Sequence, residues 1–233
     1  MPSVVHPDDV EPRRGKNVEV RITFDAQTGS ERLEQRVVRF EPGRAGPQTL
    51  VGRQALFYVV SGRGALELDG NTYELEPGTA GFVAEGESYA IDAVEPIELV
   101  SVLAPASESP PPATRRITVR FADQPEFEAS PERTFRYLIN EDAGCTDATQ
   151  FLGIVQPSKA PFHSHPYDEV GFIIEGEGIA HVDGEQTPLR RGSCFHLAAG
   201  QVHCIENTGV GPMRILGVFH PAGSPAARSY DNN

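Results

Sequence analysis

Hydrophobic and polar residues alternate along most of this chain in short runs. Examples are VEVRITF (18–24), GALELDG (64–70), RRITVRF (115–121) and GIAHVDG (178–184), each bounded by residues that favour turns. Successive side chains of a β-strand point to opposite faces, so this alternation predicts strands with one buried face. Helical spacing of apolar residues is almost absent. The sequence therefore predicts an all-β protein built from many short strands.

The chain contains an internal repeat. The segment VVSGRGALELDGNTYELEPGTAGFVAEGESY (59–89) aligns without a gap with IIEGEGIAHVDGEQTPLRRGSCFHLAAGQVH (173–203), 114 residues later. Five glycine pairs keep this register: Gly62 and Gly176, Gly64 and Gly178, Gly70 and Gly184, Gly78 and Gly192, Gly86 and Gly200. A repeat of this length predicts two copies of one all-β domain.

A proline-rich stretch separates the two copies. Three consecutive prolines in APASESPPPATRR (104–116) cannot belong to a central strand and indicate a stiff connector. We expect an N-terminal domain over 1–104, a linker over 105–116 and a C-terminal domain over 117–233. With no crossover helices in the pattern, each domain is expected to be an antiparallel sandwich or jelly-roll barrel.

Composition and charge narrow the function classes. The 23 glycines and 20 prolines are scattered, as many short strands joined by turns require. A formal net charge of −13 argues against a nucleic-acid partner, which needs a basic face. No signal-peptide pattern and no run of about 18 apolar residues is present, so no membrane partner is expected. The three cysteines have no zinc-finger spacing, and we expect a cytoplasmic protein with free thiols.

The segment PFHSHPYDEV (161–170) carries the clearest chemical signal. His163 and His165 are two residues apart, so both imidazoles can point to one face of a strand, and Glu169 has the same parity. His203 follows a turn at Gly200 and can lie opposite them on a neighbouring strand. Three imidazoles and one carboxylate form a mixed nitrogen and oxygen site that suits a divalent transition metal with open positions.

The spacing of these residues resembles the two signature motifs of the cupin superfamily, G-x5-H-x-H-x3-E-x6-G and G-x5-P-x-G-x2-H-x3-N. In this sequence the first motif is carried by His163, His165, Glu169 and Gly176, and the second by Gly192, Gly200, His203 and Asn207. Pro157 replaces the leading glycine and Ala198 the proline, which affects loop shape rather than the metal ligands. The resemblance covers both halves and implies a bicupin, two tandem cupin-type jelly-roll β-barrels.

The N-terminal copy lacks the metal-binding residues. Subtracting 114 from the four ligand positions gives Thr49, Val51, Ala55 and Tyr89, none of which matches the motif. We therefore expect an N-terminal barrel without metal ligands and a metal site only in the C-terminal barrel. (S)-ureidoglycine aminohydrolase, a bicupin with its metal only in the C-terminal barrel, resembles this arrangement, although this chain is short for that family.

Residues around the motif supply candidates for the substrate pocket. His196 is a candidate general base, with a hydrogen-bonded structural role as the alternative. His181 is expected to be exposed, and Cys204 to point away from the metal because it directly follows His203. The further pocket candidates are Tyr137, Gln150, Tyr167, Ile173 and Asn207.

The resemblance leaves the reaction open, because cupins include many kinds of enzyme and also binding proteins. We favour a metalloenzyme that acts on a small polar molecule at the C-terminal barrel, with a slight preference for a dioxygenase. The alternatives are a non-oxidative enzyme (an isomerase, a lyase or a ureidoglycine-aminohydrolase-like enzyme) and a non-catalytic binding module with a structural metal. The metal can be Fe, Mn, Zn, Ni or Co. Pairing of barrels within one chain and a homodimer are both open.

Overall fold

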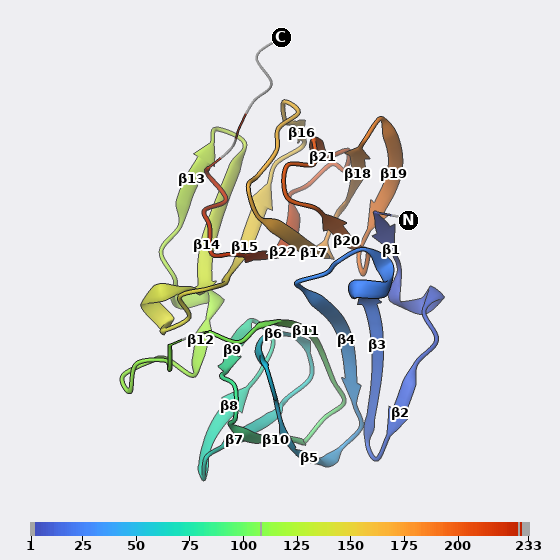
Figure 1. The fold of residues 1–233 in the computed structure, drawn as a ribbon. Coiled ribbons are helices and arrows are strands. Elements are labelled where there is room, and N and C mark those ends of the chain that lie inside the picture. Colours follow the sequence, from blue (N-terminus) through green and yellow to red (C-terminus); the bar gives the residue numbers. More distant parts are fainter. Residues whose placement is uncertain (1–2, 108, 228, 230–233) are drawn as a thin grey trace.

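The computed structural model describes residues 3–107, 109–227 and 229, and nearly all regular structure in them is β (Figure 1). The strands form two barrels, and every strand pair is antiparallel. Helical structure among the described residues is limited to short 3-10 turns, at Pro7–Asp9, Ala26–Thr28, Phe121–Asp123 and Glu141–Ala143. The all-β prediction is confirmed. No helix in this part of the chain is long and apolar enough to span a bilayer.

The N-terminal barrel consists of a seven-stranded and a four-stranded sheet. The larger sheet has the order β12-β9-β6-β11-β4-β3-β2 and the smaller one β5-β10-β7-β8. The strands are β2 (Arg13–Gly15), β3 (Val18–Phe24), β4 (Glu34–Phe40), β5 (Gly43–Thr49), β6 (Arg53–Ser61), β7 (Gly64–Leu68), β8 (Asn71–Leu75), β9 (Thr79–Val83), β10 (Ser88–Ala93), β11 (Ile97–Pro105) and β12 (Thr118–Arg120).

The C-terminal barrel repeats this plan. Its larger sheet has the order β1-β20-β17-β22-β15-β14-β13 and its smaller one β16-β21-β18-β19. The strands are β1 (Val4–Val5), β13 (Phe127–Ser130), β14 (Arg133–Ile139), β15 (Thr149–Val155), β16 (Ser158–Lys159), β17 (Asp168–Glu175), β18 (Glu177–Val182), β19 (Glu185–Arg190), β20 (Cys194–Leu197), β21 (His203–Asn207) and β22 (Met213–His220).

One hairpin in each barrel explains why Gly70 and Gly184 occur at corresponding positions of the repeat. The β7–β8 and β18–β19 hairpins turn through Asp69-Gly70 and Asp183-Gly184. In both turns the two residues have positive φ, 47° and 80° in the first and 51° and 82° in the second. A two-residue turn with positive φ at both positions matches the twist of the flanking strands, and Asp-Gly adopts it at low cost.

The first strand of each half of the chain pairs with the barrel formed by the other half. Val4 and Val5 of β1 pair with β20 at the edge of the C-terminal barrel's larger sheet. The strand after the proline-rich stretch, β12, instead pairs with β9 of the N-terminal barrel, with Thr118 opposite Gly81. Each exchanged strand covers an edge that would otherwise present unpaired backbone groups.

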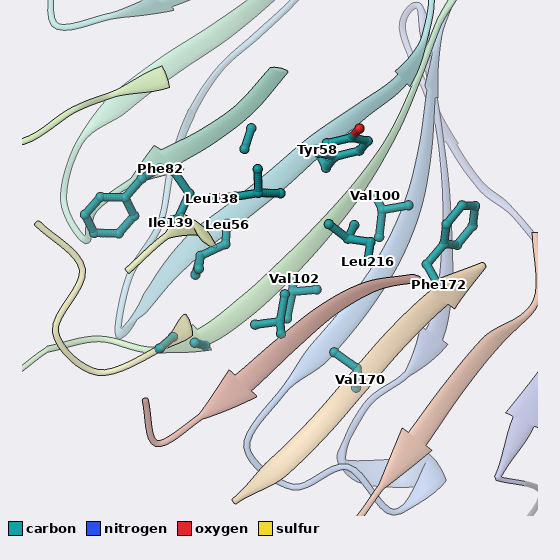
Figure 2. Packing of buried hydrophobic residues seen from close by; sticks show 14 of the residues in the cluster. Leu56, Tyr58, Phe82, Val100, Val102, Leu138, Ile139, Val170, Phe172 and Leu216 are labelled. Atoms are coloured by element: carbon teal, nitrogen blue, oxygen red, sulfur yellow. The ribbon is translucent and has the colours of Figure 1, made fainter. Parts of the chain in front are cut away.

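The larger sheets of the two barrels pack against each other through a shared hydrophobic core (Figure 2). Burial of one such aliphatic or aromatic side chain stabilises the fold by roughly 1.5–3 kcal/mol. Both faces of these sheets are therefore covered, one by the barrel interior and the other by the partner barrel. The core includes Leu56, Tyr58, Val100 and Val102 of the N-terminal barrel and Val170, Phe172 and Leu216 of the C-terminal barrel.

Candidate metal centre

Three histidines converge in the C-terminal barrel. His163 and His165 lie in the connection between β16 and β17, and His203 begins β21. A β-bridge joins His163 to His203, with N···O distances of 3.0 and 2.9 Å. The three side chains are buried, and each offers a ligand atom within 4.8 Å of the other two. This geometry can place three nitrogen ligands around one ion.

Backbone carbonyls fix the tautomer of all three imidazoles. A carbonyl oxygen only accepts, so each Nδ1 in contact with one carries the hydrogen and donates it. Nε2 is then the nitrogen with the lone pair, and its ring is held in orientation as in known metal-ligating histidines. The contacts are His163 Nδ1 to Pro161 O at 2.9 Å, His165 Nδ1 to Ala227 O at 3.0 Å and His203 Nδ1 to Gln201 O at 2.9 Å.

Glu169 borders the histidine cluster. It lies in β17 and is buried, and its Oε2 is 3.8 Å from Nε2 of His165. Its carboxylate faces the same cavity as the histidines. The donor set, three oriented imidazoles and one adjacent carboxylate, fits a divalent transition metal.

A cavity of about 80 Å³ opens beside the histidines and Glu169. Its wall is mostly apolar. Arg133 is the one arginine or lysine among the described residues that line it. Arg133 donates from Nη2 to the Ile205 carbonyl at 2.6 Å, which anchors the side chain. The apolar wall includes Phe135, Phe151, Phe195, Leu197, Ile215 and Phe219.

The segment after β22 supports the site from outside the sheet. Ser229 pairs with Ser164, between the first two histidines, with N···O distances of 3.0 and 3.1 Å. The Tyr167 hydroxyl donates to the Ser224 carbonyl at 2.7 Å, and the Tyr167 ring stacks on His165 with centroids 5.0 Å apart. Since Pro225 also lines the cavity, this segment forms part of its wall.

The structure places three pocket candidates next to the cavity but not on its wall. Tyr167 lies behind the His165 ring, on which its own ring stacks. Ile173 is buried in the apolar core of the barrel. The Asn207 side-chain amide stabilises the loop after β21, because it donates to Val155 O at 2.7 Å and to Gly211 O at 2.9 Å.

The structure brings neither Tyr137 nor Gln150 to the cavity wall. The Tyr137 hydroxyl donates to Ser224 Oγ at 3.0 Å. Gln150 is fully buried, and its amide nitrogen and oxygen make no hydrogen bond. Gln150 has the parity of Leu152, which belongs to the core between the barrels, whereas Phe151 lines the cavity.

His196 also faces the other barrel. Its neighbours Phe195 and Leu197 line the cavity, so His196 points through the opposite face of β20, where its ring lies 5.8 Å from that of Phe24. Burial lowers the pKa of His196, and the carboxylate of Asp168, 3.9 Å away, acts in the opposite direction. We expected that His196 could line the pocket as a general base. Its side chain instead lies on the face of β20 that is turned to the other barrel.

The predicted exposure of His181 is wrong. It is buried, its Nε2 lies 2.7 Å from Glu206 Oε2, and the ring of Phe162 packs edge-on against it. His181 does lie opposite to Ala180 and Val182, but that face is covered by neighbouring side chains. Cys204 is buried on the far side of β21 from the cavity, with Sγ 3.1 Å from the Ala160 carbonyl.

Sequence reasoning missed Arg133 and the aromatic wall. The alternation in RTFRYLI (133–139) places Arg133 and Phe135 on one face of a strand. It gives no sign of which face is turned to the cavity, because both faces of this sheet carry apolar residues.

Comparisons with known proteins agree with this architecture. The family described as Cupin domain matches residues 36–103 and 151–219. The oxalate-binding protein of Thermotoga maritima is 31% identical over 86 residues, which is 36% of this chain and 71% of that protein. The tetracenomycin polyketide synthase protein TcmJ of Streptomyces glaucescens is 37% identical over 60 residues, 25% of this chain and 40% of that protein.

Solved structures of Bacillus subtilis oxalate decarboxylase superpose on almost the whole chain. An alanine variant of that enzyme gives a TM-score of 0.81 at 16% identity, covering 99% of this chain and 80% of that one. A second structure, described by its Mn(II) centres, gives a TM-score of 0.80 with the same coverage. At this identity the likeness shows the fold alone, two barrels in tandem.

Proposed function

Because this chain belongs to the cupin family, we propose that its C-terminal barrel binds one divalent metal and acts on a small carboxylate. The three histidines whose Nδ1 atoms are anchored to carbonyls carry this proposal, together with the adjacent Glu169. Histidines that cluster on a surface without a metal are not expected to have the same tautomer and to direct their Nε2 atoms toward one point.

The wall of the cavity supports a carboxylate ligand. Arg133 presents a permanent positive charge, and guanidinium groups bind carboxylates through paired hydrogen bonds. The surrounding aromatic side chains keep water away and so strengthen that attraction. The volume of about 80 Å³ suits a molecule of only a few heavy atoms. The names of the oxalate-binding and oxalate-decarboxylating relatives make oxalate the first ligand to test.

Each group in the cavity has a separate task in this account. His163, His165 and His203 would hold the metal together with Glu169. The bound ion would supply Lewis acidity, and iron would add redox chemistry with dioxygen. Arg133 orients the carboxylate and balances its charge. The phenylalanines exclude water, and the carbonyls that accept from the Nδ1 atoms keep the three imidazoles in place.

For the reaction, we favour a dioxygenase and keep a non-oxidative reaction of the decarboxylase or lyase type as the alternative. The titratable groups on the described part of the cavity wall are the three histidines, Glu169 and Arg133. A reaction that needs a separate proton-transferring side chain therefore has little support here.

The same observation favours a second candidate, a binding module that holds a carboxylate on a metal without converting it. The cavity wall offers recognition, from Arg133 and the metal ligands, but no further acid or base among the described residues. The name of the Thermotoga relative, an oxalate-binding protein, is in line with this candidate.

One set of incubations separates these candidates. Protein reconstituted with Fe(II) or Mn(II) is mixed with oxalate in air and under argon, and oxalate, dioxygen and carbon dioxide are measured. Consumption only in air supports an oxygen-dependent oxidation, in which dioxygen takes up the two electrons released as oxalate becomes two molecules of carbon dioxide. Consumption in both supports a non-oxidative enzyme, and saturable binding with full recovery of oxalate supports a binding module. Failure of oxalate and other short carboxylates to bind the metal-loaded protein would refute the proposal.

Two variants locate the binding. Arg133→Met is expected to weaken oxalate binding at least about tenfold while the metal stays bound, because a charge-assisted hydrogen bond contributes roughly 1.5–3 kcal/mol. Arg136→Met, on the opposite face of the same strand, is the matched control and should leave affinity unchanged.

A further inference from the structure

The N-terminal barrel contains a cavity of its own at the place that corresponds to the candidate metal centre. Its volume is about 50 Å³. Its wall includes Ala55, Val83, Tyr89 and Ile91, each 114 residues before a residue that lines the C-terminal cavity. Those counterparts are Glu169, Leu197, His203 and Ile205. The N-terminal barrel therefore lacks the metal ligands but contains a cavity at the same place.

The polar groups of this cavity differ in kind from those of the C-terminal one. In the C-terminal barrel, Phe151 pairs across strands with Gly217, and its ring fills the space where a side chain at 217 would lie. At the corresponding pair in the N-terminal barrel stand Arg36 and Ser101, both on the cavity wall. A guanidinium and a hydroxyl thus replace an aromatic side chain.

Tyr89 and Gln48 complete the polar side of the cavity. Tyr89 stands where the C-terminal barrel has His203, and its hydroxyl donates to Gln48 Oε1 at 3.3 Å. Burial raises the pKa of Tyr89, and the positive charge of Arg36 acts against that rise. Arg36 and Tyr89 both line the cavity, so both groups can contact one ligand.

Arg36 keeps hydrogen-bonding capacity for such a ligand. Oε1 of Glu34 accepts from its Nε and lies 2.5 Å from its Nη2. A guanidinium has five N–H donors in a planar fork, more than one carboxylate oxygen can accept. The pair is only partly exposed, with about a quarter of each side chain accessible, so a bound anion would be shielded from bulk solvent.

We propose that the N-terminal barrel is a second, metal-independent binding site for a short monocarboxylate. Its carboxylate would contact Arg36 and Tyr89, and its short apolar tail would lie against Val18, Val38 and Leu99, which line the remainder of the cavity. The small volume excludes a bulky tail. The two barrels then recognise anions in two ways, one with a metal and one with side chains alone.

Butyrate is the probe for this site. Isothermal titration of protein treated with EDTA is expected to show one saturable butyrate site, whereas n-butylamine, of similar size and opposite charge, should not bind. Arg36→Met should weaken butyrate binding about tenfold or more, because it removes the charged hydrogen-bond donor. Tyr89→Phe should weaken it several-fold, because the phenol hydrogen, which Gln48 Oε1 accepts without ligand, would turn to the carboxylate in the complex.

Matched variants distinguish the two barrels. Arg39→Met removes a half-exposed arginine from the same strand, outside the cavity wall, and His165→Ala disables the C-terminal site; neither should change butyrate affinity. Thermal unfolding of each variant verifies that it is folded. The absence of saturable butyrate binding would overturn the proposal, as would equal binding of n-butylamine or loss of binding in His165→Ala. None of these results bears on the metal centre of the C-terminal barrel.

Discussion

Both barrels have a phenylalanine paired with a glycine at the same cross-strand position, but the two residues have exchanged strands. In the N-terminal barrel Phe57 of β6 faces Gly81 of β9, and in the C-terminal barrel Gly171 of β17 faces Phe195 of β20. A Cβ at Gly81 would lie 2.1 Å from the Phe57 ring, and one at Gly171 would lie 2.0 Å from the Phe195 ring. Each interior has space for one aromatic ring at this position and does not specify the strand that carries it.

This comparison separates two kinds of constraint. Packing fixes the total volume at a position, so it is kept in both barrels although the residues have changed places. Metal chemistry fixes individual donor atoms, so replacing four side chains is enough to remove it. The N-terminal barrel has accordingly retained its interior and lost its metal-binding residues.

Exchanging Phe195 and Gly171 in the C-terminal barrel tests whether the two arrangements are equivalent, and it has the largest expected effect on stability. Phe195→Gly alone should cost about 3–5 kcal/mol in the free energy of unfolding, because it leaves a cavity. Gly171→Phe alone should also destabilise strongly, because two rings would compete for one space. The double variant reproduces the N-terminal arrangement and should recover much of the loss. Urea denaturation of all four proteins measures this, and a double variant as unstable as the sum of the two single variants would contradict the comparison.

The shared core predicts that the two barrels unfold together. Leu216→Ala, at the packed sheets between the barrels, should lower the free energy of unfolding by about 2–5 kcal/mol. Leu68→Ala affects only the N-terminal core but should lower the same single transition, including the signal of the C-terminal barrel. Calorimetry compares the two variants with the wild type. Two separate transitions, with Leu68→Ala moving only one of them, would show that the barrels are independent.

Tyr167→Phe tests the support of the metal centre from the C-terminal segment. The hydroxyl donates to Ser224 O at 2.7 Å and to Ala227 O at 3.3 Å, and the Ala227 carbonyl also accepts from His165. Its loss should weaken metal affinity about tenfold, the lower end for groups that orient metal ligands. Competition with a chelating dye measures the affinity. Tyr73→Phe in the N-terminal barrel is the control, and equal affinities for the two variants would rule out this supporting role.

Two buried histidines, His196 of β20 and His220 at the end of β22, predict the smallest effect, a dependence of the free energy of unfolding on pH. Burial lowers the pKa of both His196 and His220 in the folded protein. Their neutral forms therefore stabilise the fold above the ordinary histidine pKa of about 6.5, and this contribution is lost as the pH falls below it. His196→Gln should make the stability of metal-free protein less sensitive between pH 7 and 5. A wild-type profile that is flat in this range would disprove the assignment.

The sequence contained most of the information about fold class and about the converging histidines. The glycine register revealed the repeat, because two-residue hairpin turns such as Asp183-Gly184 strongly favour glycine wherever they occur. The spacing of His163 and His165 indicated a common direction, because strand geometry is local. These features depend on residues close together in the chain or on a repeat of the whole domain.

Other features depended on contacts that no local pattern records. All residues of β20 are buried, so alternation could not show that Phe195 faces the cavity and His196 the other barrel. The burial of His181 depends on Phe162 and Glu206 from other segments. The exchange of β1 and β12 between barrels depends on which sheet edge is open, which is a property of the assembled fold.

The metal content of the purified protein tests the central claim most directly. Wild type, His165→Ala and Tyr89→Ala are prepared without chelator and without nickel resin, and transition metals are quantified by elemental analysis. We expect about one equivalent per chain in the wild type and loss of this metal in His165→Ala. We expect retention in Tyr89→Ala, which changes the position of the N-terminal barrel that corresponds to His203. A wild type without metal after anaerobic reconstitution, or a His165→Ala variant that keeps full occupancy, would contradict the claim.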